Sequence, residues 1–163
     1  MNTIQFFKKH NITNYTIDNN DHITVNESLW LSYKITELPK DFGSNLTING
    51  HLYLSDNNLT ELPTNFGTNL TIHGNLNLRH NNLTSLPESF SDITINGLDY
   101  AIIYHQLPKN ICQYKNHNLY MKIDLSGNNF PSDYPETLDE VKEHLLYVRR
   151  TRKLKEILLL NTI

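Results

Sequence analysis

The sequence contains few of the residues that stabilise secreted proteins or carry a chain through a membrane. Cys112 is its single cysteine, so no disulfide can form within the chain. No apolar run approaches the roughly 20 residues that a membrane-spanning helix needs. The start, MNTIQFFKKHNIT, has a short apolar patch before two lysines, and we read no signal peptide there. Together these features predict an intracellular, cytoplasmic protein that has no membrane contact.

Charge is also scarce. Charged residues make up 19% of the 163 residues and the net charge is −3, which does not suggest a protein that binds polyanions through its bulk charge. Hydrophobic residues make up 38%, which is enough for a packed core. The length fits one domain of ordinary size.

Two stretches of the chain are nearly the same. Residues 38–61 read LPKDFGSNLTINGHLYLSDNNLTE and residues 62–85 read LPTNFGTNLTIHGNLNLRHNNLTS, and they align without a gap. Upstream, residues 23–39 are a near-copy, and downstream, IDLSGNNF at 123–130 matches LYLSDNNL. A fixed internal period predicts stacked supersecondary units, each of which buries its apolar face against its neighbours.

Within one unit the residues alternate between apolar and polar, which predicts a strand with one buried face over residues 46–54. The inward positions are Leu46, Ile48, Gly50, Leu52 and Leu54. An asparagine follows where the chain must turn, at Asn57, Asn81 and Asn128. A buried amide there can bond the backbone groups that the turn leaves free, so we expect the stacked copies to form an asparagine ladder.

The units LYLSDNNLTELPTNF and LNLRHNNLTSLPESF resemble the LxLxxNxLxxLPxxF pattern of the leucine-rich repeat family. The resemblance implies a short α/β-type repeat solenoid with parallel strands on its concave side. It also implies recognition of other macromolecules by that side, usually without catalysis. The N-terminal style is similar to that of small repeat proteins of bacteriophages and large DNA viruses, which suggests a host protein as partner.

The expected organisation has three parts. Residues 1–22 form an N-terminal cap, residues 23–130 the repeats, weakest at 98–118, and residues 131–163 a C-terminal capping helix. Thr3 is the expected N-cap of a helix over 4–10. Two short strands follow within 12–25. The last helix is expected over 136–159, because Leu138, Val141, Leu145 and Val148 recur at helical spacing. Its apolar end could instead pair with a second copy of the chain, so the oligomeric state stays open.

The exposed columns of the concave face are the candidate binding site. Trp30 and Tyr53 are expected to be neighbours on an otherwise polar, little-charged sheet, which is how protein-binding hot spots look. The remaining candidates are Asn49, His51, His73, Asn75, Asn77 and Arg79. These residues predict a non-enzymatic module that binds a protein partner, whose identity the sequence does not give.

A nucleic-acid-associated protein is the alternative, because YVRRTRKLKE places five basic residues within 149–155. The acidic first half of the same helix and the negative net charge argue against it.

Catalysis and metal binding are less favoured. Cys112 is flanked in sequence by His105 and His117, but nothing in the sequence fixes their geometry. His51 and His73 could share a zinc ion across adjacent strands, but two ligands make a poor site. We therefore expect no metal and no cofactor.

Overall fold

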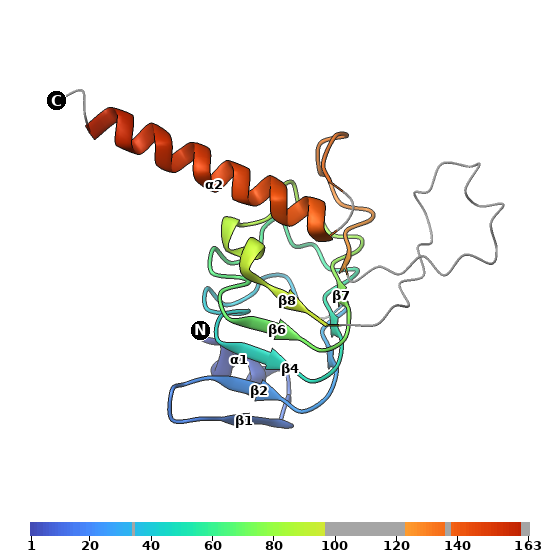
Figure 1. Ribbon diagram of the computed structural model, residues 1–163. Coiled ribbons are helices and arrows are strands. Elements are labelled where there is room, and N and C mark those ends of the chain that lie inside the picture. Colours follow the sequence, from blue (N-terminus) through green and yellow to red (C-terminus); the bar gives the residue numbers. More distant parts are fainter. Residues whose placement is uncertain (34, 97–122, 136–137, 161–163) are drawn as a thin grey trace.

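A computed structural model describes residues 1–33, 35–96, 123–135 and 138–160, and Figure 1 shows a stack of repeats with a long helix at one end. The elements in chain order are α1 (Thr3–Lys9), β1 (Tyr15–Ile17), β2 (Ile23–Val25), β3 (Leu29–Trp30), β4 (Leu46–Ile48), β5 (Leu52–Tyr53), β6 (Leu70–Ile72), β7 (Leu76–Asn77), the 3-10 helix η1 (Glu88–Asp92), β8 (Thr94–Ile95), β9 (Ile123–Asp124) and α2 (Leu138–Leu160).

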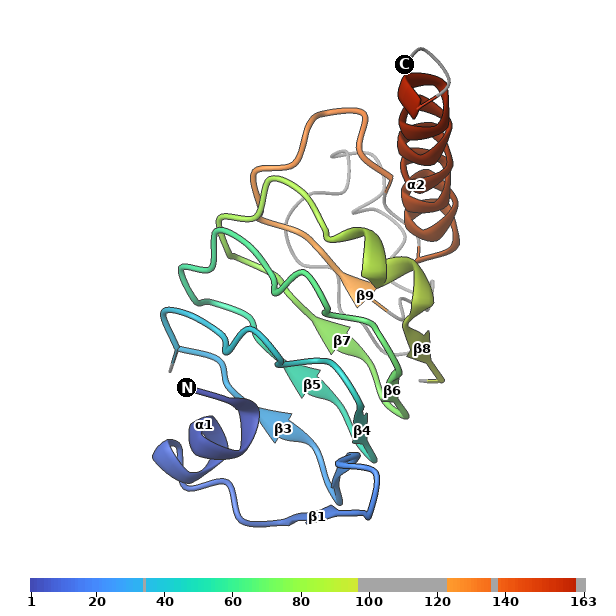
Figure 2. The same ribbon diagram turned by 90° about the vertical axis from the view of Figure 1, so that its left-hand side faces the viewer.

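The strands form two sheets. The first sheet has the order β1-β2-β4-β6-β8 and the second has the order β3-β5-β7-β9. The β1–β2 pair is antiparallel and the other pairs of described strands are parallel. Each turn of the chain adds one strand to each sheet, and Figure 2 shows the strands of the second sheet lying in one row. The predicted solenoid of parallel strands is confirmed.

The predicted continuous strand over 46–54 was wrong, because the chain turns a corner in the middle of it. β4 belongs to the first sheet and β5 to the second, and Asn49–His51 lie between them. The corner depends on glycine. The Gly74 N–H donates to the Gly50 carbonyl at 2.8 Å, and a Cβ on Gly74 would lie 2.7 Å from the Gly50 carbonyl carbon. Successive corners therefore approach too closely for any side chain at this position.

The inward positions of both sheets fill one core. Leu46 and Ile48 point inward from the first sheet, Leu52 and Leu54 from the second, and each is fully buried. On the return side of each turn a phenylalanine stacks on the next, with ring centroids 6.3 Å apart for Phe42–Phe66 and 6.0 Å apart for Phe66–Phe90. The sequence repeats because each turn makes the same interior contacts with the next.

The N-terminal end of this core is covered by α1. Phe6 and Phe7 are buried and pack edge-on against Phe42, with centroids 5.7 and 6.4 Å away. The expected N-cap was wrong by one residue: Asn2 caps the helix, accepting the Gln5 N–H at 2.9 Å. Thr3 instead lies in the first turn, where its N–H donates to both carboxylate oxygens of Asp41. The predicted strand pair follows as β1 and β2.

The fragment IDLSGNNF continues the stack. β9 pairs in parallel with β7, so that Ile123 lies beside Leu76 and Asp124 beside Asn77. The doubtful copy at 98–118 and the cysteine at 112 with its flanking histidines lie outside the described residues.

The helix expected over 136–159 is found as α2, and residues 136–137 lie outside the described residues. Val141 and Leu145 are buried, whereas Val148 is 38% exposed, so the packed stripe is shorter than expected. Figure 1 shows α2 crossing the end of the repeats above η1 and extending beyond them. None of the described helices is long and apolar enough to span a membrane.

Candidate protein-binding surface

The outward positions of the two sheets differ in kind. On the first sheet the register aligns four threonines, Thr24, Thr47, Thr71 and Thr94. On the second sheet it aligns four different residues, Trp30, Tyr53, Asn77 and Asp124. The last of these four is buried, and its carboxylate accepts the Ser126 N–H at 3.0 Å. The exposed part of the second sheet therefore runs from Trp30 to Asn77.

An aromatic pair occupies the N-terminal end of this surface. The rings of Trp30 and Tyr53 stack with centroids 3.9 Å apart and an angle of 16° between their planes. His51 lies against Tyr53 at 5.5 Å. Trp30 remains 59% exposed, and burial raises the pKa of the Tyr53 hydroxyl, which keeps that group neutral. The expected pair of neighbouring aromatic rings is therefore present as a stack in which more than half of the Trp30 surface is exposed.

A chain of polar side chains borders the aromatic pair. His80 Nδ1 lies 3.0 Å from Asp56 Oδ1, and the Arg79 Nε–H donates to His80 Nε2 at 3.1 Å. Tyr33, which is 79% exposed, completes the chain, and its hydrogen bond to the Asp56 carboxylate raises the pKa of its hydroxyl. Since Nε2 accepts a bond, the neutral His80 ring carries its proton on Nδ1 and donates to Asp56.

Asp56 is the central member of this hydrogen-bonded row of side chains. Burial raises the pKa of its carboxyl, but hydrogen bonds from His80, Ser55 and Tyr33 outweigh burial and leave the pKa below its usual value. Asp56 therefore stays ionised near neutral pH and presents a negative charge between the Tyr33 hydroxyl and the His80 ring.

The backbone explains why these residues project together. Tyr33, Asp56, His80 and Gly127 stand at the same point of successive turns, and each has a positive φ, between 51° and 67°. A Cβ on Gly127 would collide with the His80 ring, so glycine leaves room for that ring. Side chains at the other three positions pay a conformational cost of about 1 kcal/mol each. Sequence analysis missed Tyr33, Asp56 and His80, although Asp56 and His80 differ between two otherwise similar copies.

The corner between the sheets holds two of the candidates in structural bonds. His51 Nδ1 accepts the Asn75 N–H at 2.9 Å, and the His51 N–H donates to Ser28 Oγ at 3.0 Å. Asn75 itself is only 9% exposed, and its placement on the exposed face was wrong. Asn75 directly follows Gly74, at the corner between β6 and β7.

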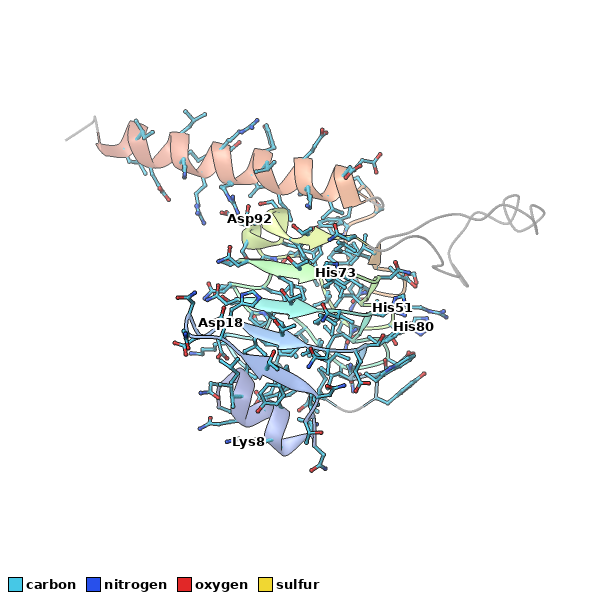
Figure 3. The ribbon with its side chains drawn as sticks, turned by 60° about the horizontal axis from the view of Figure 1, so that its bottom comes forward. Lys8, Asp18, His51, His73, His80 and Asp92 are labelled. Carbon is cyan, nitrogen blue, oxygen red and sulfur yellow. The ribbon has the colours of Figure 1, made fainter. Side chains whose placement is uncertain are left out.

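Asn49 and His73 are exposed but stand at the corner after β4 and β6, outside the second sheet. His73 Nδ1 lies 3.5 Å from Asn96 Nδ2, and His51 Nδ1 is already used by Asn75. Figure 3 shows His51 and His80 on the side of the repeats away from Asp18. Among the described residues no group of three metal-ligating side chains is close enough to hold an ion.

The asparagines at the turns bond the backbone of two successive turns. Asn81 Nδ2 donates to the carbonyls of Leu54 and Leu78 at 2.9 Å, and its Oδ1 accepts the Leu59 N–H at 3.2 Å. Asn57 and Asn128 make the equivalent bonds one turn earlier and one turn later. These residues tie each turn to its neighbour and are not part of the exposed surface.

The basic segment of α2 is partly engaged with the repeats. Arg149 pairs with Asp92 at 3.1 Å and Arg152 with Glu88 at 3.0 Å. Figure 3 shows Asp92 where the repeats meet the helix. Two of the five basic residues proposed for nucleic acid are thus used to hold α2 against η1.

The parallel strands, the inward leucines and the asparagines at the turns together define a repeat protein whose units stack into a solenoid. The Leucine Rich Repeat family model matches residues 51–69 and 75–93, which contain β5 and β7. The chain therefore contains at least two leucine-rich repeats. Repeats of this family generally mediate protein–protein interaction and are typically not enzymes. No curated protein and no solved structure gives a significant match to the chain.

Proposed function

We propose that this protein binds a protein partner through the exposed part of its second sheet, with Trp30 and Tyr53 as anchors. The observation that carries the proposal is the contrast between the two sheets. The outward column of the first sheet has the same residue in each described turn, whereas that of the second changes at every turn. A surface that only has to form strands can repeat itself, and a surface that has to fit a partner cannot.

The two full copies support the same conclusion. Residues 38–61 and 62–85 differ at nine of 24 aligned positions, and five of the nine lie within residues 49–56. That short stretch contains the corner, the strand β5 of the second sheet and Asp56. The four positions 45–48, which hold β4, do not differ from 69–72. Differences between the copies therefore collect on the face that we assign to binding.

The chemistry of the surface indicates what kind of contact it makes. The exposed part of Trp30 offers an apolar aromatic surface that suits an aliphatic side chain or a guanidinium group. Beside it, Asp56 offers a fixed carboxylate, and Arg79 and Asn77 offer donors and acceptors. A protein segment that places an apolar or arginine side chain on Trp30 and a donor beside Asp56 matches this arrangement.

The test is to enrich binders from a library of protein fragments made from the cells in which this chain occurs. Each enriched fragment is then measured against the wild type and against a Trp30→Ala, Tyr53→Ala double variant. We expect the double variant to bind about 30-fold more weakly, which corresponds to about 2 kcal/mol, the loss typical of a hot spot.

The matched control is a Thr47→Ala, Thr71→Ala variant, which alters the outward column of the first sheet in the same two turns. It should bind the same fragments with an affinity within about threefold of the wild type. Fragments that ignore the aromatic pair, or that depend equally on the threonines, would show that the second sheet is not the binding surface.

A further inference from the structure

The corner between β4 and β5 contains an asparagine that is followed directly by a glycine, Asn49 and Gly50. The sequence has a second pair of this kind at 96–97, but Gly97 lies outside the described residues. The Asn49 side chain is exposed, and its amide forms no hydrogen bond with any residue that the structure describes. That amide can therefore turn toward its own backbone without losing a contact.

The backbone N–H that follows Asn49 is also without an acceptor. Within the described part of the chain the Gly50 N–H makes no hydrogen bond. One turn later, the equivalent N–H of Gly74 donates to the Gly50 carbonyl at 2.8 Å. The two corners thus have the same backbone course but differ in whether the glycine nitrogen is bonded.

Other exposed asparagines lack this combination. Asn58 and Asn82 are exposed as Asn49 is, but each is followed by a leucine. The N–H groups of those leucines, Leu59 and Leu83, donate to asparagines of the ladder at 3.2 and 3.0 Å. A bulky neighbour and a bonded nitrogen both protect these two side chains from attack by the backbone.

We propose that Asn49 is a site of spontaneous deamidation, in which the Gly50 nitrogen attacks the side-chain carbonyl carbon of Asn49. The nitrogen loses its proton to solvent, the new bond from nitrogen to Cγ closes a succinimide ring, and the side-chain nitrogen leaves as ammonia. Water then opens the ring at either carbonyl and gives aspartate or isoaspartate. Glycine leaves the attacking nitrogen unhindered, because it has no side chain. The proposal does not depend on the function proposed above.

The corner has little room for the isoaspartate product, whose backbone is longer by a methylene. A Cβ on Gly50 would lie 2.6 Å from the Ser28 nitrogen, and Gly74 approaches Gly50 from the next turn. His51 follows at once and lies against Tyr53 at 5.5 Å, so a displaced corner also shifts one neighbour of the aromatic pair. The isoaspartate form should therefore be less stable than the unmodified protein.

The first test incubates the folded protein at mildly alkaline pH and follows its peptides by mass spectrometry, with isoaspartate detected by specific enzymatic methylation. We expect Asn49 to be converted before Asn58 and Asn82, because only Asn49 has an unhindered, unbonded nitrogen after it. An Asn49 that stays unchanged in the folded protein while it is converted in urea would overturn the proposal.

The second test separates the structure from the sequence motif. His73→Asn creates the same Asn–Gly pair in front of Gly74, and the first copy of the repeat already has asparagine at this point. Position 73 should be converted about fivefold more slowly than Asn49 in the same molecule, because the Gly74 N–H must first leave its acceptor. In urea the two positions should react at similar rates. Equal rates in the folded protein would contradict the role given to the unbonded Gly50 nitrogen.

The third test compares melting temperatures. Asn49→Asp carries the new charge on a normal backbone at an exposed position, so it should melt close to the wild type. The purified isoaspartate form should melt below both. Equal melting of the isoaspartate form and Asn49→Asp would contradict the close packing of this corner.

Discussion

The two sheets are built from the same turns of the same chain, yet their outward residues differ. The first sheet repeats a buried–outward–buried pattern with threonine in the middle of three successive strands, and its outward column continues as threonine in a fourth. The second sheet keeps its inward residues apolar but places tryptophan, tyrosine, asparagine and aspartate at the outward position. The inward residues are thus equally uniform in the two sheets, and the outward residues vary only in the second sheet.

This difference separates the residues that fold the protein from those proposed to give it a partner. Leucines, phenylalanines, corner glycines and turn asparagines recur because every turn makes the same contacts with the next. This requirement does not apply to the residues on the outward side of β3, β5 and β7, nor to Tyr33, Asp56 and His80, which follow these strands. Variants in the two groups should therefore affect different measurements.

The largest effect on stability should come from the phenylalanine column. Phe66 is fully buried between Phe42 and Phe90, so Phe66→Ala opens a cavity inside the stack. We expect it to lower the free energy of unfolding by about 3–5 kcal/mol in urea titrations. Thr71→Ala, an outward change in the same turn, should cost less than about 1 kcal/mol. Equal losses of unfolding free energy in the two variants would contradict the distinction between the inward and the outward residues of the repeats.

The next effect concerns the asparagine ladder. Asn81→Ala removes an amide that bonds four backbone groups in two turns, leaving buried groups without partners. We expect a loss of roughly 2–4 kcal/mol in the free energy of unfolding. The neighbouring Asn82 is exposed, so Asn82→Ala is a matched control and should change stability by less than about 0.5 kcal/mol. Similar results for both would mean that the ladder contributes little.

A smaller effect should come from the stacked pair on the second sheet. A double-mutant cycle on Trp30→Ala and Tyr53→Ala should give a coupling of about 0.5–1.5 kcal/mol in unfolding free energy. The same two changes should reduce partner binding far more than they reduce stability. If the two changes reduced the unfolding free energy more than they reduced partner binding, Trp30 and Tyr53 would belong with the residues that fold the protein.

The smallest effect should come from the ion pair at the end of the first sheet. The hydrogen bond from Arg149 lowers the pKa of Asp92 below its ordinary value of 3.8. A lowered folded-state pKa gives stability that is complete above about pH 5 and is lost as pH falls through the folded pKa. Because the Asp92 side chain is 48% exposed, the contribution should stay below about 1 kcal/mol.

The measurement for that ion pair compares melting temperatures of the wild type and Asp92→Asn. The wild type should melt higher near neutral pH, and the difference should shrink and then vanish as pH falls through the lowered folded-state pKa of Asp92. A difference that persists in strong acid would mean that Asp92 acts through packing.

The sequence was sufficient to predict what the repeat makes identical in every turn. The inward leucines, the neighbouring positions of Trp30 and Tyr53, and the continuation at 123–130 all follow from aligning copies that stack in register. These features depend on the period alone, which the sequence shows directly.

The corner could not be predicted from alternation. Gly50 occupies an inward position, and the apolar pattern continues through it, so one strand and two strands have the same periodicity. Only the packing of one corner glycine on the next decides between them. The corner positions of Asn49 and His73 follow from that corner, and Asn75, which stands at it, is buried.

The most direct test of the account places a photo-crosslinking phenylalanine analogue at Tyr53 in one variant and at Thr47 in another, in cells that naturally express the chain. These positions lie on the outward sides of β5 and β4, in the same turn, and both are half-buried. We predict that the analogue at 53 cross-links to one protein and that the analogue at 47 does not. Cross-linking of the same protein from position 47 alone would contradict the assignment of binding to the second sheet.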